Sequence, residues 1–237
     1  MTLAPALVGI SHGTSSAEGQ RAVTRLIEAV ALTNPELVVA QGFVDVQHPD
    51  PAETLAELPP EQPAIVVPLL LSAGYHVHVD LTKAVAAETD RAVTLAAPLG
   101  PDDRLVQVLQ QRLDAVGFGS GDELVLAVAG SSDARAVADC RVVAERLAVA
   151  VGRNVAIGFL SAAAPRLDEA IADTRSRHPR ARIVVSSYLL APGYFQDLAE
   201  SAGGDVTTAP LLLPEEPAPQ QIVDVVVDRY RAALPTT

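Results

Sequence analysis

Two histidines and an aspartate are the side chains of this sequence best suited to act together. His12 lies in a Ser-His-Gly-Thr-Ser segment, Asp45 follows an apolar run, and His76 follows a Gly-Tyr pair. Two imidazoles and one carboxylate suit a borderline divalent ion such as iron(II), cobalt or nickel, whereas magnesium and calcium sites are mostly oxygen. Three protein ligands leave coordination positions open, as in sites that act on a bound ion rather than only hold the fold together.

A comparison of the chain with itself singles out these three residues. Four short segments of the first half recur in the second half in the same order. They begin at Gly13, Gly42, Leu70 and Ala97, and their counterparts begin at Gly130, Gly158, Leu189 and Ala209. The first two segments are 29 residues apart in the first half and 28 in the second. Self-similarity of this kind indicates a duplicated structural unit.

The two copies differ at the positions that could bind a metal. In the register of the repeat, His12 faces Ala129, Asp45 faces Ser161 and His76 faces Phe195. The second copy therefore lacks both imidazoles and the carboxylate. A shared scaffold explains the residues that both copies keep. We therefore expect the three side chains found only in the first copy to form one functional site.

Alternating strands and helices must position these residues. Apolar runs predict strands at residues 6–10, 37–44, 64–71 and 92–97, and again at 124–129, 155–159, 183–190 and 206–211. In the first half, helical patterns predict a helix after residue 15, a short helix after Pro51, and a helix that begins at Asp80 as its N-cap. Further helices are predicted at residues 102–116, 133–151 and 165–176. This order predicts an α/β fold of two tandem three-layer α/β/α domains, each with a four-stranded parallel sheet joined by right-handed crossovers.

The predicted domains are residues 1–118, which carry the metal site, and residues 122–237, a degenerate copy of the same unit. The glycine-rich segment 117–122 connects them. In parallel α/β sheets, ligands bind outside the carboxyl ends of the strands. His12, Asp45 and His76 follow the first three strands of the first domain, so we expect them to converge at one edge of one sheet.

The composition restricts the partners of the protein. The formal net charge is −12, and both halves are acidic, which argues against nucleic acid because a phosphate backbone requires a clustered cationic surface. The start of the chain has no basic segment before its apolar stretch, and no apolar run approaches the length of a membrane span. We expect a cytoplasmic monomer that contacts no membrane. The lone Cys140 is interpreted as a small buried apolar residue.

The histidine segments resemble those of a known enzyme family. Residues 11–15 resemble the opening histidine motif of the class II chelatases that serve sirohaem and cobalamin synthesis, and residues 68–77 resemble their second histidine segment, with Asp80 where the family has Asp. The likeness covers both halves and is similar to the two-domain sirohydrochlorin chelatases. Asp45 stands where the family commonly has Glu, and His78 stands at a position that the family leaves variable.

The resemblance implies a lyase that inserts iron(II), or cobalt(II), into sirohydrochlorin, with no prosthetic group and with the divalent metal as substrate. It implies that His12 and His76 bind the metal and accept protons, and that Asp45 is the supporting base. The macrocycle would lie in a cleft between the halves. A non-catalytic carrier of metal or tetrapyrrole is the alternative. A histidine-dependent phosphatase is a further one, although Ser11 stands where those enzymes have Arg.

Other polar residues could contribute to such a site. His48 lies in a loop near the same edge and His78 near His76, while His178 is expected at the surface. A substrate with many carboxylates calls for local arginines in an acidic protein. Arg21, Arg25 and Arg135 lie on the helices that follow the first strand of each half and are candidates, although a surface position is the simpler interpretation of each.

Overall fold

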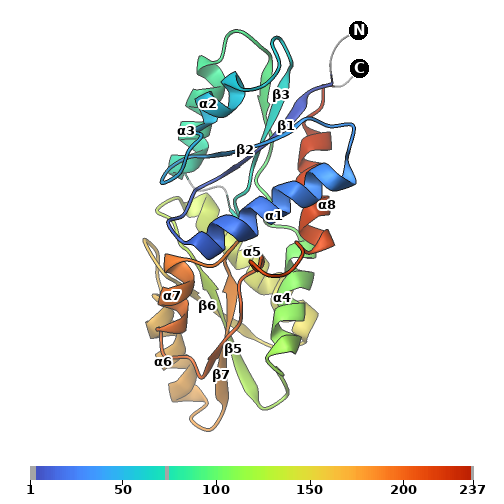
Figure 1. The fold of residues 1–237 in the computed structure, drawn as a ribbon. Helices are drawn as coiled ribbons and strands as arrows, with labels where there is room; N and C mark the ends of the chain where they lie inside the picture. Colours follow the sequence, from blue (N-terminus) through green and yellow to red (C-terminus); the bar gives the residue numbers. More distant parts are fainter. Residues whose placement is uncertain (1–3, 73–74, 236–237) are drawn as a thin grey trace.

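The fold consists of two parallel sheets that lie one above the other with helices on both faces of each (Figure 1). The structure is a computed structural model that describes the backbone of residues 4–72 and 75–235 and the side chains of residues 4–72 and 81–235. The sheets have four strands each, in the orders β2-β1-β3-β4 and β6-β5-β7-β8, and every pairing is parallel. This architecture confirms the predicted fold class. Within the described ranges, no helix has the length and apolar character needed to span a membrane.

Each half of the chain supplies one sheet and its alternating helices. The first half contains β1 (Ala6–Ser11), α1 (Ala17–Thr33), β2 (Val39–Phe43), α2 (Pro51–Ala56), β3 (Ala64–Pro68), α3 (Tyr75–Ala87), β4 (Val93–Leu95) and α4 (Asp103–Ala115). The second half contains β5 (Asp122–Val128), α5 (Ala134–Val151), β6 (Val155–Phe159), α6 (Leu167–Arg177), β7 (Arg182–Tyr188), α7 (Tyr194–Glu200), β8 (Val206–Thr207) and α8 (Gln220–Ala232).

The helix boundaries correct the sequence analysis in two places. The prediction that Asp80 caps the third helix is wrong, because α3 begins at Tyr75 and Asp80 lies inside it. The two repeats agree at this point, since α7 begins at the corresponding Tyr194. Two helices, α7 and α8, were not predicted. The first has only seven residues, too few to show a helical period, whereas α8 has a periodic apolar face that was overlooked.

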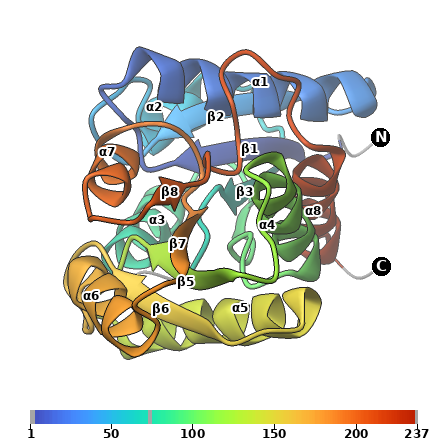
Figure 2. The ribbon, with the colours of Figure 1, turned by 90° about the horizontal axis from the view of Figure 1, so that it is seen from below.

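The last helix of each repeat packs against the other repeat. Helix α4 ends the first half of the chain but contacts α5 and β7, whereas α8 ends the second half and contacts α1 and β3. Figure 1 shows the exchange, with the green α4 beside the lower sheet and the red α8 beside the upper one. The two exchanged helices also contact each other and lie side by side in Figure 2. Where one domain ends and the other begins in sequence thus stays a prediction.

The exchange gives the molecule one continuous core across both repeats. Buried side chains of the first sheet, such as Leu7, share a cluster with Leu126 of the second sheet and with Ile222 of α8, all 0% exposed. Smaller apolar clusters lie on the outer face of each sheet. Burial of a large aliphatic side chain stabilises the folded state by about 1.5–3 kcal/mol. Because the cluster is shared, we expect the two repeats to unfold together.

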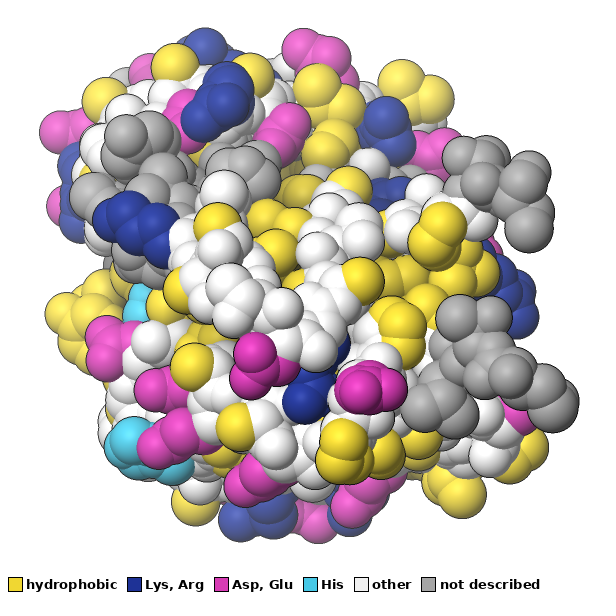
Figure 3. All heavy atoms as spheres, turned by 90° about the horizontal axis from the view of Figure 1, so that it is seen from above, with side chains coloured by type: hydrophobic (Ala, Val, Ile, Leu, Met, Phe, Trp, Pro, Cys, Tyr) yellow, Lys and Arg dark blue, Asp and Glu magenta, His cyan; other side chains and the backbone are white. Residues whose placement is uncertain are grey.

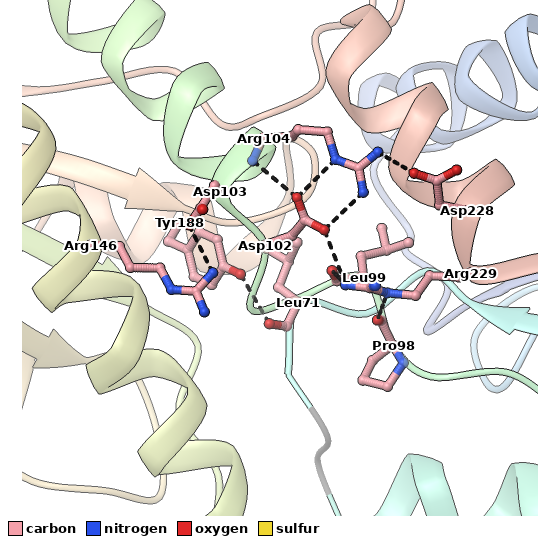
Figure 4. A network of polar contacts seen from close by, with 10 residues as sticks. All are labelled: Leu71, Pro98, Leu99, Asp102, Asp103, Arg104, Arg146, Tyr188, Asp228 and Arg229. Atoms are coloured by element: carbon pink, nitrogen blue, oxygen red, sulfur yellow. Dashed lines mark hydrogen bonds and ion pairs between the residues drawn. The ribbon is translucent and has the colours of Figure 1, made fainter. Parts of the chain in front are cut away.

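A polar network fastens α8 to the point where the chain leaves the first sheet (Figure 4). Asp102 caps α4 and accepts hydrogen bonds from the backbone nitrogen of Arg104 at 3.0 Å and from its Nε at 2.9 Å. Arg104 also donates to Asp228 of α8 at 2.6 Å. From α8, Arg229 donates to Asp102 at 3.3 Å and to the carbonyl oxygen of Pro98 at 2.7 Å.

The same network lowers the pKa of Asp102. Burial alone would raise this pKa, but the hydrogen bonds and charge of Arg104, with the charge of Arg229, outweigh it. A carboxyl whose pKa is lowered in the folded state stabilises that state above its unfolded pKa of about 3.9. The stabilisation is lost as the pH falls through the lowered folded value.

We therefore expect Asp102→Asn to destabilise the protein at neutral pH but not in acid. Asparagine keeps an oxygen for the N-cap, but it removes the charge and the second oxygen, which accepts from Arg104 and Arg229. The free energy of unfolding should therefore fall by about 1–3 kcal/mol at pH 7. The difference from the wild type should shrink as the pH drops and the wild-type aspartate becomes neutral. Urea unfolding over a pH series measures both effects. The control is Asp103→Asn, because this side chain is 79% exposed; equal losses for the two variants would contradict the network's role.

Candidate metal site at the cleft between the repeats

A cleft of about 480 Å³ lies between the repeats at the carboxyl ends of their strands. From the first repeat it is lined by the turns after β1 and β2 and by the segment after β3. From the second repeat it is lined by the turn after β5 and by the segment after β7. The volume lies within the range of about 300–1,000 Å³ typical of small-molecule sites. The edge on which the sequence analysis placed the functional residues therefore opens into a cavity.

His12 lies on the cavity wall, and parallel strand pairing sets its backbone position. Ser11 at the end of β1 pairs with Phe43 of β2. Beyond the strands the pairing continues, because the backbone nitrogen of Asp45 donates to the carbonyl oxygen of His12 at 2.9 Å. The side chain of His12 is exposed and lines the cleft. The structure thus places the backbones of His12 and Asp45 side by side at the carboxyl edge of the first sheet.

A glycine and an amide hold the turn that carries His12. Gly13 has a φ of +94°, and a Cβ there would lie 1.9 Å from the carbonyl oxygen of Asp45. The backbone nitrogen of Thr14 donates to Oε1 of Gln47 at 2.9 Å, and Gln20 of α1 donates to the carbonyl oxygen of Thr14 at 2.8 Å. The loop after β2 therefore clamps the turn after β1.

The carboxylate of Asp45 is exposed beside this turn. Its Oδ1 accepts a hydrogen bond from the backbone nitrogen of Val46 at 2.8 Å. Val46 has a φ of 66°, a left-handed conformation that is rare for a β-branched residue and costs about 1–3 kcal/mol. Backbone strain of this kind concentrates at functional sites. Val46 and Gln47 line the cleft, whereas Asp45 itself lies at its border.

For the third candidate, His76, the structure describes the backbone. The backbone of His76 lies in the first turn of α3, at the carboxyl end of β3. Its side chain, and that of His78, lie outside the described residues. Among the side chains that are described, no group of three His, Cys, Asp or Glu residues is close enough to hold a metal ion. Convergence of His12, Asp45 and His76 thus stays a prediction.

Two groups of the second repeat complete the cleft wall without adding charge. Cys140 of α5 is buried, as the sequence predicted, and burial raises the pKa of its thiol to about 11. A protonated thiol is a poor metal ligand. The hydroxyl of buried Tyr188 donates to the carbonyl oxygen of Leu71 at 3.0 Å, linking β7 to the segment that leads into α3 (Figure 4).

The candidate arginines do not line the cleft. Arg21 pairs with Glu215 at 3.5 Å, and Arg135 pairs with Asp133 at 2.8 Å. The described lining residues include no lysine, arginine or acidic side chain, and Arg25 is not among them. On the outer face seen in Figure 3, acidic and basic side chains are likewise interspersed. The cleft is therefore close to neutral where it is described, despite the acidic composition of the chain.

The two loop histidines lie outside the cleft lining. His48 is exposed, and its hydrogen bond to Glu53, 2.9 Å long, raises the pKa of the imidazole. His178 lies at the surface within 3.4 Å of Glu123, as the sequence predicted. Gln47, which clamps the turn at Thr14, was not among the predicted site residues. The repeat could have revealed Gln47, since its counterpart is Ala163.

Comparison with known proteins gives one family for both halves of the chain. The model of the family CbiX matches residues 6–116 and again residues 123–213. The two matches cover most of the chain, and they divide it near the connection predicted from the repeat.

Individual relatives agree with this match. A sirohydrochlorin cobaltochelatase from Sulfurisphaera tokodaii is 31% identical over 81 residues, which are 33% of this chain and 68% of the relative. A sirohydrochlorin cobaltochelatase from Sulfolobus acidocaldarius is 29% identical over 112 residues, which are 46% of this chain and 89% of the relative. Among solved structures, SirB from Bacillus subtilis with Fe³⁺ has the same fold, with a TM-score of 0.80, 19% identity and coverage of 97% of this chain and 95% of that one.

The close approach of Gly13 to Asp45 predicts a specific loss of stability. In Gly13→Ala the new Cβ would meet the carbonyl oxygen of Asp45 as well as the left-handed backbone, so the free energy of unfolding should fall by about 2–5 kcal/mol. Gly117→Ala is the matched control, since Gly117 has a φ of +65° but nothing within 4 Å of its added Cβ. Urea unfolding of both variants measures the difference; a loss no larger at Gly13 than at Gly117 would contradict the clamped turn.

Proposed function

The chain belongs to the CbiX family, and from this we propose that it is a chelatase that inserts a divalent metal ion into sirohydrochlorin. The single observation that best supports the proposal is the cleft itself. The carboxyl ends of both sheets open into one cavity, and His12 lies on the wall of the first repeat where the second repeat has Ala129. The metal ion and the ring can then bind between one wall that carries a metal-binding histidine and one wall that lacks it.

We assign His12 and His76 as metal ligands and proton acceptors, with Asp45 as the supporting base. Neutral imidazole binds borderline divalent ions and titrates near physiological pH, so the same ring can release an ion and then accept a proton. The contact between the backbones of His12 and Asp45 supports this assignment for two of the three residues. The assignment of His76 rests on the repeat and on the family motif.

Insertion exchanges two protons for one ion. As the metal forms four bonds to the ring nitrogens, two pyrrole N–H groups lose their protons, and groups near the ring must accept them. An exposed imidazole and an exposed carboxylate beside the cleft are suited to take these protons and pass them to water. A closed metal cage would keep the ion, whereas few and exposed ligands allow its delivery.

Several finer points belong to the same proposal. Iron(II) and cobalt(II) are the metals we propose, acting as substrates and without a prosthetic group. The relatives named as cobaltochelatases and the SirB structure with Fe³⁺ are consistent with either ion. We also propose that the chain works as a monomer in the cytoplasm, with the second repeat acting as the other wall of the cleft.

Replacement of either imidazole should abolish most of the turnover. We expect His12→Ala and His76→Ala each to lower the rate of metal insertion about 100-fold or more, because each removes a metal ligand that also accepts a proton. The measurement is the absorbance of metallated product under anaerobic conditions, with catalytic amounts of protein, sirohydrochlorin and iron(II) or cobalt(II).

His178→Ala serves as the control, since this histidine lies at the surface and outside the cleft lining. It should keep the wild-type rate, and all three variants should keep the wild-type unfolding midpoint. Full activity in His12→Ala would remove the proposed site. A wild-type protein that yields only stoichiometric product would be a carrier of metal or tetrapyrrole instead of an enzyme.

A further inference from the structure

The two walls of the cleft differ in chemistry. The described wall of the first repeat combines aliphatic side chains such as Leu69 with the imidazole of His12 and with hydroxyl and amide groups, which belong to Ser11, Thr14, Ser15, Gln47 and Ser72. Among the described lining residues of the second repeat, the polar side chains are those of Cys140, Tyr188 and Tyr194. The thiol of Cys140 is protonated, and the hydroxyl of Tyr188 is already bonded to Leu71. The second wall is thus apolar and uncharged.

Two aromatic side chains form the outer part of this apolar wall. Tyr194 and Phe195, in the first turn of α7, line the cleft and are 71% and 37% exposed. Their ring centroids are 5.7 Å apart, with an interplanar angle of 57°. The whole chain has only eight Phe and Tyr residues and no Trp. Phe195 occupies the position that corresponds to His76 in the repeat.

Buried hydrogen bonds hold the helix that carries these aromatic rings. The residue after Phe195 is Gln196, which is 5% exposed. Its Oε1 accepts from the hydroxyl of Ser187 at 2.6 Å, and its Nε2 donates to the carbonyl oxygen of Thr208 at 3.1 Å and to Glu200 at 2.8 Å. These bonds tie α7 to the ends of β7 and β8. An exposed aromatic pair on a fixed helix is a preformed binding surface.

The segment before α7 is also seated against the first repeat. A Cβ at Gly19 of α1 would lie 2.3 Å from the carbonyl oxygen of Pro192. The backbone of this segment therefore packs directly on the first turns of α1, which follow the turn of His12. The backbone that carries the aromatic rings is thus seated against the repeat that carries His12.

We propose that Phe195, with Tyr194, binds one face of the tetrapyrrole ring, so that the metal enters from the opposite face, on the side of His12. This inference rests on the proposed function and specifies how the substrate is oriented. A conjugated macrocycle presents a broad apolar face that stacks on aromatic side chains, while its carboxylates stay at the ring edge and in water. The second repeat has therefore replaced a metal-binding histidine with a stacking surface.

The affinity for the metal-free ring tests the inference directly. Phe195→Ala should weaken the binding of sirohydrochlorin about tenfold, measured by absorbance or fluorescence titration under anaerobic conditions without metal. Tyr194→Ala should weaken it in the same direction. Phe195→Trp keeps a stacking surface and should restore the affinity. Leu32→Ala, at an 81% exposed apolar residue of α1 outside the cleft lining, should leave the affinity unchanged.

The affinity of the ring-free protein for cobalt(II) separates this role from a role at the metal site. Phe195→Ala should bind cobalt(II) as the wild type does, and a parallel loss of cobalt affinity would overturn the inference. Wild-type affinity for sirohydrochlorin in Phe195→Ala, with metal insertion intact in the wild type, would overturn the stacking surface and leave the proposed function standing. Weakened ring binding in Phe195→Ala, with no insertion by the wild type, would support the stacking surface and overturn the proposed function. A wild-type protein that does not bind sirohydrochlorin would overturn both.

Discussion

The exchange of the last helix between the repeats is the constraint on which the cleft depends. Each sheet is covered on one side by a helix from the other half of the chain, since α4 packs against β7 and α8 packs against β3. The shared core and the network around Asp102 then keep the carboxyl ends of the two sheets facing each other across one cavity. Without the exchange, each sheet would present part of an apolar face to water, and the facing walls would have no fixed spacing.

Duplication followed by divergence explains how one cleft acquired two different walls. Both repeats keep the glycine turn after their first strand, with φ values of +94° at Gly13 and +90° at Gly130. They also keep the strained residue after the second strand, Val46 in one and Ala162 in the other. What they do not share is the chemistry that these turns carry. The scaffold positions side chains equally well in both halves, so the function follows from which side chains it positions.

The sequence predicted the parts of this structure that arise from local pattern and from the repeat. Apolar runs predicted the strands. His12 and Asp45 both follow strands of the first sheet, and the structure joins their backbones by a hydrogen bond at the carboxyl edge of that sheet. The same reasoning could not foresee the helix exchange, because an amphipathic helix such as α8 has the same periodicity whichever sheet it covers.

Local sequence patterns also gave no sign of the long-range polar contacts. The amide of Gln47 clamps a turn 33 residues earlier in the chain, and the hydroxyl of Tyr188 bonds a carbonyl group 117 residues away. No local pattern encodes either contact. The N-cap expected at Asp80 was wrong because a favourable capping residue is not a helix start when the helix has already begun at Tyr75. The meeting of His76 with His12 and Asp45 stays a prediction from the repeat.

The most direct measurement of the central claim is a titration of the metal-free protein with cobalt(II), followed by its visible absorption spectrum. If only the first repeat handles the ion, one equivalent binds per chain with the spectrum of imidazole ligation, and this binding is lost in His12→Ala and in His76→Ala. Two equivalents per chain, or binding that survives the loss of both histidines, would contradict the claim that only the first repeat binds the metal ion.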